Sequence, residues 1–99
     1  MHTKTEIRRA VEKVLNAAQQ MSGRQCPSIA DDTKPIGDLD GFDSLSGIEA
    51  TCMLEVELKC TLGDGSAFVH ESPTGTRRAL TVVQAVERVV EMLAPTRAA

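Results

Sequence analysis

The residues best suited to chemistry stand together in the run Gly41-Phe42-Asp43-Ser44-Leu45, which leads into an amphipathic stretch ending at Lys59. Ser44 offers a hydroxyl at the point where a loop becomes a helix. A serine there can do two jobs: it can cap the helix, or it can be a handle that another enzyme modifies. Ser46-Gly47-Ile48-Glu49 has capping-box spacing of its own, so the helix has two candidate starts. Function depends on which job Ser44 has.

Three apolar stripes at helical spacing predict the elements that position this serine. The first helix covers about residues 4–20, opens on the capping-box pair Thr3 and Glu6, and has the apolar positions Ile7, Val11, Val14, Leu15 and Ala18. The second covers about residues 44–59, with an inward stripe of Leu45, Ile48, Cys52 and Val56, widened by Leu54 and Leu58. The last covers about residues 80–94, from an N-cap at Thr81 to Pro95, with the apolar face Val82, Val83, Val86, Val89, Val90 and Leu93.

Two connections separate these helices. The first, about residues 22–43, is unusually long for a compact domain, and we expect Ile36, Leu39 and Phe42 to pack it onto the helices. The second, about residues 60–79, is broken by glycines and Pro73, and Ala67-Phe68-Val69 is expected to form a short helical turn that packs inward. The predicted fold is therefore all-α: a small up-down bundle of three main helices plus one short helix, with a long first loop.

Composition limits the function classes. The 99 residues allow a single domain, 1–99, with an ordered core of about 4–94, too small for a core plus a deep catalytic cleft. Two Phe and no Trp or Tyr require an aliphatic core and argue against binding single-stranded nucleic acid. A net charge of -3, no apolar run near the ~20 residues that span a bilayer, and an N-terminus without a signal-peptide segment indicate a cytoplasmic chain with no nucleic-acid partner and no membrane span.

The cysteines indicate neither a disulfide framework nor a metal site. Cys26, Cys52 and Cys60 are odd in number and lack Cys-x-x-Cys spacing, so a zinc site made of them and His70 is a minor alternative. Cys52 is expected to be a small core residue, and the other two to be reduced bystanders.

The acidic charge gathers around Ser44. Residues 37–64 hold seven acidic residues against Lys59 alone, a net charge of -6, while the rest of the chain sums to +3. Such a surface can steer a protein toward basic partners, although a charged helix face is often simply solvated.

Asp43-Ser44-Leu45-x-x-Ile48-Glu49, preceded by Ile36-x-Asp38-Leu39 and followed by Leu80-Thr81-Val82-Val83-Gln84-Ala85-Val86, resembles the acyl carrier proteins over roughly residues 4–94. The resemblance implies that Ser44 carries 4'-phosphopantetheine, transferred from coenzyme A by a phosphopantetheinyl transferase, with Asp43 as a capping and recognition residue. It also implies a non-catalytic, monomeric carrier of thioester-bound acyl groups for a lipid, polyketide or other specialised pathway. Its partners would be acyl-loading, ketosynthase or acyltransferase enzymes, and the partner-binding candidates are Leu45, Ile48, Glu49 and Glu55.

The sequence departs from that family at several places. Ala50-Thr51 stand where carriers of fatty-acid synthesis often have a larger apolar residue, Gly47 loosens the first helical turn, and residues 61–79 are long and glycine-rich. These differences favour a specialised carrier over a housekeeping one. Two other functions stay open. One is a helical interaction module that lacks the prosthetic group. The other is a small hydrolase with Ser44 as nucleophile and His70 as base, although Ser44 lacks a Gly-x-Ser-x-Gly elbow and nothing in the sequence shows that His70 or His2 could reach it.

Overall fold

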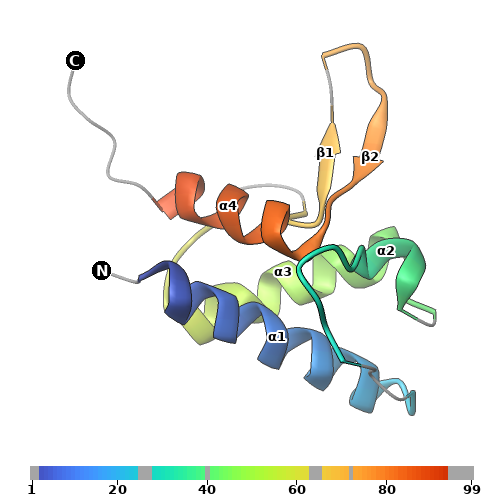
Figure 1. Ribbon diagram of the computed structural model, residues 1–99, viewed down its shortest axis with the longest axis vertical. Coiled ribbons are helices and arrows are strands. Elements are labelled where there is room, and N and C mark those ends of the chain that lie inside the picture. Colours follow the sequence, from blue (N-terminus) through green and yellow to red (C-terminus); the bar gives the residue numbers. More distant parts are fainter. Residues whose placement is uncertain (1–2, 25–27, 40, 63–65, 72, 94–99) are drawn as a thin grey trace.

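In its described residues the chain is mostly helical, with four helices and one small two-stranded sheet (Figure 1). The computed structural model describes residues 3–24, 28–39, 41–62, 66–71 and 73–93. In chain order the elements are α1 (Lys4–Met21), α2 (Pro35–Asp38), α3 (Ser44–Leu58), β1 (Val69–Glu71), β2 (Arg77–Ala79) and α4 (Val82–Leu93). The three long helices lie within one or two residues of their predicted bounds. The end of α4 expected at Pro95 lies outside the described residues.

Both α1 and α4 begin with a capping box. The Thr3 hydroxyl accepts a hydrogen bond from the Glu6 N–H at 3.1 Å, and the Glu6 carboxylate accepts one from the Thr3 N–H at 3.3 Å. At α4 the Thr81 hydroxyl accepts from the Gln84 N–H at 3.2 Å, and the Gln84 amide oxygen accepts from the Thr81 N–H at 3.0 Å. These bonds satisfy N–H groups that a helix start leaves unpaired, so the adjacent sequence is enough to predict both starts.

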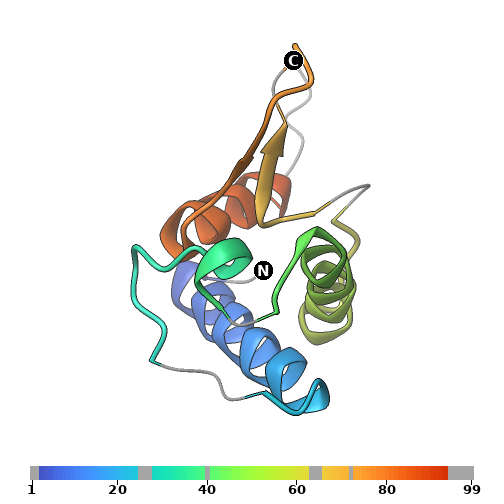
Figure 2. The ribbon, with the colours of Figure 1, turned by 90° about the vertical axis from the view of Figure 1, so that its right-hand side faces the viewer.

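The long first connection is tied to the helices at several points. Leu39 and Phe42 are buried and Ile36 packs against the same core, as predicted. The carbonyls of Thr33 and Asp31 accept hydrogen bonds from the first two N–H groups of α4, at 2.7 and 3.1 Å. In Figure 2 the connection passes along one side of α1 on its way to α2. It therefore fixes the start of α4 as well as the entry to α3.

The buried face of α3 is only in part the predicted one. Leu54 and Leu58, which widened the predicted stripe, are buried. Leu45, Ile48, Cys52 and Val56 are exposed, and Gly47, Ala50 and Thr51 lie in the buried row in their place. The physical reason is that both rows recur at helical spacing, so the helix is apolar on two sides and periodicity cannot choose between them. The row with the smaller side chains near its start is the one that packs closely against the rest of the chain.

An antiparallel hairpin replaces the short helical turn expected between α3 and α4, so the prediction of an all-α chain was wrong there. The register pairs Val69 with Ala79, His70 with Arg78, and Glu71 with Arg77. Gly75, with φ +87°, adopts the left-handed conformation in the connecting turn. Figures 1 and 2 both show the hairpin projecting beyond the helices, and β2 also contacts α2. The short helix of the fold is instead α2, a single distorted turn within the first connection.

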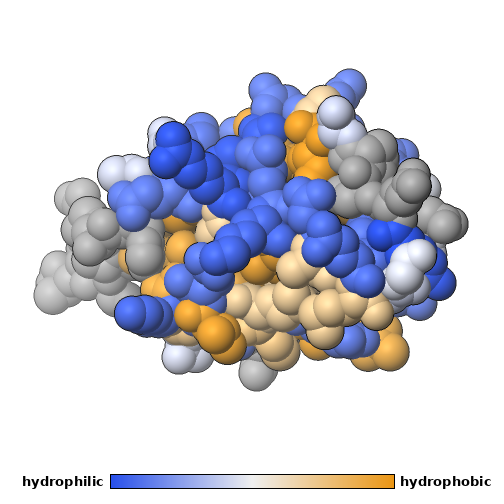
Figure 3. All heavy atoms as spheres, turned by 90° about the horizontal axis from the view of Figure 1, so that it is seen from below, coloured by the Kyte–Doolittle hydropathy of each residue, from blue (hydrophilic) through white to orange (hydrophobic). Residues whose placement is uncertain are grey.

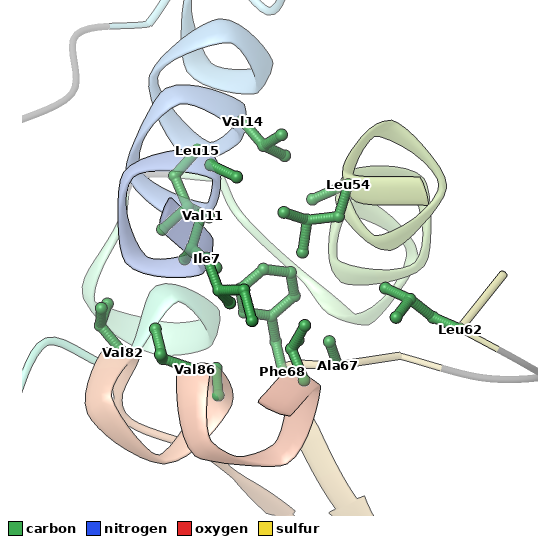
Figure 4. Close-up of a cluster of buried hydrophobic side chains, with 14 of the residues drawn as sticks. Ile7, Val11, Val14, Leu15, Leu54, Leu62, Ala67, Phe68, Val82 and Val86 are labelled. Atoms are coloured by element: carbon green, nitrogen blue, oxygen red, sulfur yellow. The ribbon is translucent and has the colours of Figure 1, made fainter. Parts of the chain in front are cut away.

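The core lies between α1, α3 and α4, and Phe68 occupies its middle (Figure 4). The ring of Phe68 is fully buried and meets Phe42 edge to face, with ring centroids 6.0 Å apart and planes at 83°. The predicted inward residues of α1 line one side of it, as do Val82, Val86 and Val89 of α4. Ala67 and Phe68 pack inward as expected, but from a turn that leads into β1.

The surface mixes charged and apolar side chains. Figure 3 shows apolar patches between hydrophilic ones on the face seen from below in Figure 1. The large apolar residues that the structure leaves exposed are Met21, Leu45, Ile48 and Val56. Within the described ranges, no helix combines the length and the apolar character needed to cross a membrane.

Candidate functional site

A tight turn delivers the chain to Ser44. The side chain of Phe42 is 4% exposed and anchors the turn in the core, and the Phe42 N–H donates to the Leu39 carbonyl at 3.1 Å. Gly41 precedes it with φ +67°, a conformation that costs glycine little and other residues more. The apolar anchor and the glycine turn together bring the next residues to the surface at a fixed place.

Asp43 caps α3. Its backbone is extended, and its carboxylate accepts hydrogen bonds from the Ser46 N–H at 2.9 Å and from the Ser46 hydroxyl at 3.1 Å. The Ser46 N–H, followed by the Ser46 hydroxyl, holds the pKa of the Asp43 carboxyl below its usual value, because both donors stabilise the charged form. The helix therefore starts at Ser44 and not at Ser46, and the capping task belongs to Asp43.

Ser44 is the first residue of α3 and its side chain is exposed. No hydrogen bond to its hydroxyl is found within the described part of the chain. The first N–H groups of a helix and its dipole create a positive end that favours a phosphate group. A nucleophilic oxygen at this position is thus accessible and not committed to the fold.

An exposed apolar row begins beside Ser44. We call Leu45, Ile48, Cys52 and Val56 the outer row; they follow the side of α3 that faces away from the core. Leu45 is 63% exposed, Ile48 44% and Val56 79%. Exposed apolar residues are ordinary one at a time, but a contiguous row on one helix is typical of a contact surface. Cys52, expected in the core, is exposed here.

The described carboxylates near the site differ in whether they accept hydrogen bonds within the chain. Asp38, Asp43, Glu55 and Glu57 each accept a hydrogen bond within the chain. Among the described carboxylates of residues 37–64, Glu49 has no such bond and is exposed beside the outer row. Asp40 and Asp64 lie outside the described residues. Four of the five described carboxylates in this range therefore accept hydrogen bonds within the chain.

Glu55 in particular has a structural task. Its carboxylate accepts from the Leu62 N–H at 2.7 Å, and its side chain is half-buried. This bond fixes the segment that leaves α3, after Lys59 has ended the helix in a left-handed conformation with φ 53°. Of the four predicted partner-binding residues, the structure places Leu45, Ile48 and Glu49 on one exposed surface and sets Glu55 apart.

The close contact between the inner side of α3 and residues 66–67, a joint between the two segments, was not predicted from the sequence. The Thr51 hydroxyl donates to the Gly47 carbonyl at 2.7 Å and accepts from the Ala67 N–H at 2.9 Å. A Cβ atom built on Gly47 would lie 3.0 Å from the Ser66 hydroxyl oxygen and 3.2 Å from Ile36 Cδ1. The glycine inside the helix, Gly47, with Thr51 one turn later, was the sequence feature that could have pointed to this joint.

The remaining candidates have little structural support. His70 lies on β1 opposite Arg78, and no hydrogen bond joins it to Ser44 in the described ranges; His2 lies outside them. Cys52 is exposed and Cys60 half-buried, while Cys26 is not described. No group of three or more His, Cys, Asp or Glu side chains able to hold a metal ion occurs among the residues described.

Comparisons with protein-family models, with curated proteins and with solved structures found no match for this chain. The assignment of function therefore depends on the geometry of the site and on the resemblance carried by Asp43-Ser44-Leu45 and its flanks.

Proposed function

We propose that this protein is an acyl carrier protein, non-catalytic itself, which carries a 4'-phosphopantetheine group on Ser44. The observation that carries the proposal is the exposed Ser44 hydroxyl at the first position of α3, which makes no hydrogen bond among the described residues because Asp43 caps the helix. A serine needed as a cap would not be free for esterification. The arrangement of a long helix, a long connection and a second helix opening at Ser44 agrees with the expected carrier bundle, while the hairpin departs from it.

The residues around Ser44 suit a phosphodiester. In the modification, the Ser44 oxygen forms a bond to the phosphorus that bears the pantetheine arm as the phosphoanhydride bond of coenzyme A breaks. Adenosine 3',5'-bisphosphate leaves, and the serine proton passes to a base of the transferase. The N-terminal end of α3 favours the resulting negative charge. When bound, the group supplies a terminal thiol that holds an acyl chain as a thioester. This chain presents that group and identifies itself to partner enzymes.

The outer row and Glu49 are the recognition surface in this proposal. Leu45 and Ile48 flank the attachment point and expose apolar area, and Glu49 adds a carboxylate that accepts no hydrogen bond from the described part of the chain. A partner with a basic rim around an apolar patch would complement them. Glu55 contributes less to this surface than expected, because the Leu62 N–H occupies its carboxylate.

The proposal is tested by intact-protein mass measurement after incubation with coenzyme A and a promiscuous phosphopantetheinyl transferase. We expect one phosphopantetheine to be added to the wild type and none to Ser44→Ala. Ser66→Ala, which removes a hydroxyl outside the exposed helix start, is the matched control and should be modified. A chain that stays unmodified with several transferases would contradict the proposal.

The outer row also favours a second function, a carrier-like interaction module without the prosthetic group. Its apolar area is exposed whether or not Ser44 is modified, so it does not need the arm to contact a partner. In that case the protein purified from its native host would have its unmodified mass, and Ser44→Ala would bind partners like the wild type.

A further inference from the structure

The contact between the first two turns of α3 and residues 66–68, which we call the inner seam, lies on the core side of α3 close to Ser44. Gly47 is one helical turn beyond Ser44, and there the α3 backbone approaches Ser66 and Ile36 so closely that a Cβ would lie 3.0 and 3.2 Å from their side chains. The space beside Gly47 is therefore filled by these two side chains, and an aliphatic chain could enter there only by displacing them.

Hydrogen bonds hold the next turn of the inner seam. Thr51 is 2% exposed, and its hydroxyl joins the Gly47 carbonyl to the Ala67 N–H at 2.7 and 2.9 Å. The Ser66 hydroxyl accepts from the Phe68 N–H at 3.1 Å. Opening the seam would strand the Ala67 N–H in an apolar environment, which proteins rarely tolerate.

The space behind the inner seam is occupied. Phe68 is fully buried there, with its ring between α1, α3 and α4 and against Phe42 (Figure 4). Ile7 and Leu54 surround it and are also fully buried. An acyl chain could enter this core only by displacing a ring that many contacts hold in place.

The described surface grooves offer no alternative shelter near Ser44. The groove beside the site, lined by Phe42, Ser46, Glu49, Met53 and the end of α1, has a volume of about 90 Å³. The two larger grooves are lined by residues of the first half of α1, with Leu58 at the far end of α3 or with Val83 and Val86 of α4.

Building on the proposed function, we infer that the cargo of this carrier stays outside the helical bundle and that Thr51 and Phe68 are the residues that exclude it. The substrates are then short or polar acyl groups, which lose little by remaining in water. Long aliphatic chains are disfavoured, because the bundle offers no apolar space in which they could be buried.

The test loads Ser44 with acyl groups of increasing length, from acetyl to decanoyl, by using the corresponding acyl-coenzyme A and a promiscuous transferase. Melting temperature and methyl NMR shifts are then compared between the forms. We expect the same melting temperature for the acetyl and decanoyl proteins, with shift changes confined to Leu45, Ile48 and their neighbours. A melting temperature that rises with chain length, together with shifts of the Leu54 and Val86 methyls, would overturn the inference.

Two variants assign the exclusion to named residues. Thr51→Val keeps the side-chain shape but loses the hydrogen bonds, and Phe68→Leu empties part of the core; each should make the decanoyl form melt higher than the acetyl form. Val89→Ala also creates a core cavity, but leaves the inner seam intact, so it should show no dependence on chain length. If Phe68→Leu fails to fold, Thr51→Val decides alone. Variants that behave like the wild type would remove Thr51 and Phe68 from this role.

The outcomes separate the inference from the function it rests on. A wild type that accepts no acyl group on Ser44 would refute the carrier proposal and this inference together. A wild type that is loaded on Ser44 and is stabilised by longer chains would refute the inference alone.

Discussion

The two faces of α3 differ in side-chain size and in what they contact. The inner face has Gly47, Ala50 and Thr51 near its start, and it packs against residues 66–68 without a gap. The outer row has larger apolar residues, and the structure leaves them in water. Substitutions on the inner face of α3 should therefore change the stability of the fold. Substitutions on the outer row should change only contacts with other molecules. Ser44 stands where the two faces begin.

Truncation of a large side chain on each face of α3 is the most direct test of which face is buried. Leu54→Ala removes a fully buried side chain, so we expect the free energy of unfolding to fall by about 2–5 kcal/mol. Val56→Ala removes a side chain that is 79% exposed and should change it by less than about 0.5 kcal/mol. Urea denaturation measures both, and equal losses would contradict the assignment of faces.

Enlargement of a small side chain gives the second comparison. Gly47→Leu forces a branched side chain against Ser66 and Ile36, and overpacking of this kind costs about 1–3 kcal/mol of stability. Cys52→Leu adds a similar side chain on the outer row, where space is open, and should leave stability within about 0.5 kcal/mol. The same denaturation experiment applies. A Gly47→Leu protein as stable as the wild type would show that the inner seam can open.

Acid should weaken the start of α3 through Asp43. Hydrogen bonds from Ser46 hold the pKa of this carboxyl below its usual value in the folded protein. Its contribution to stability is therefore complete above the unfolded-state pKa of about 3.9 and is lost as the pH falls through the lower folded-state pKa. Asp43→Asn can still cap but does not titrate there, so its melting temperature should fall less than that of the wild type as the pH drops below about 4. Parallel melting curves for the two proteins would exclude this role.

The two described cysteines should differ in reactivity toward a thiol reagent. Burial, with a smaller contribution from the nearby Glu55 charge, raises the pKa of the Cys60 thiol, whereas Cys52 is exposed on the outer row. Because the thiolate is the reactive form, Cys52 should be labelled faster at pH 8. In a Cys26→Ser background, labelling of Cys52→Ser and Cys60→Ser separates the two rates. Faster labelling of Cys60 would place Cys52 on a buried face.

The sequence by itself determined the bounds of the three long helices to within two residues and the capping boxes that open α1 and α4. Thr3 with Glu6 and Thr81 with Gln84 lie three residues apart, so their pairing needs no knowledge of the rest of the fold. The start of α3 had two candidates in the sequence, and the structure selects Asp43 as its cap and leaves the Ser44 side chain exposed.

Only the tertiary structure decided which face of α3 is buried and what lies between α3 and α4. Both rows of α3 satisfy helical periodicity, and the choice depends on residues 15 or more positions away, such as Ala67, whose N–H meets Thr51. The hairpin likewise depends on cross-strand pairing, and a strand of three residues is too short to be predicted from its sequence pattern. Local hydrogen bonds are encoded in adjacent residues, whereas burial is a property of what the whole chain brings together.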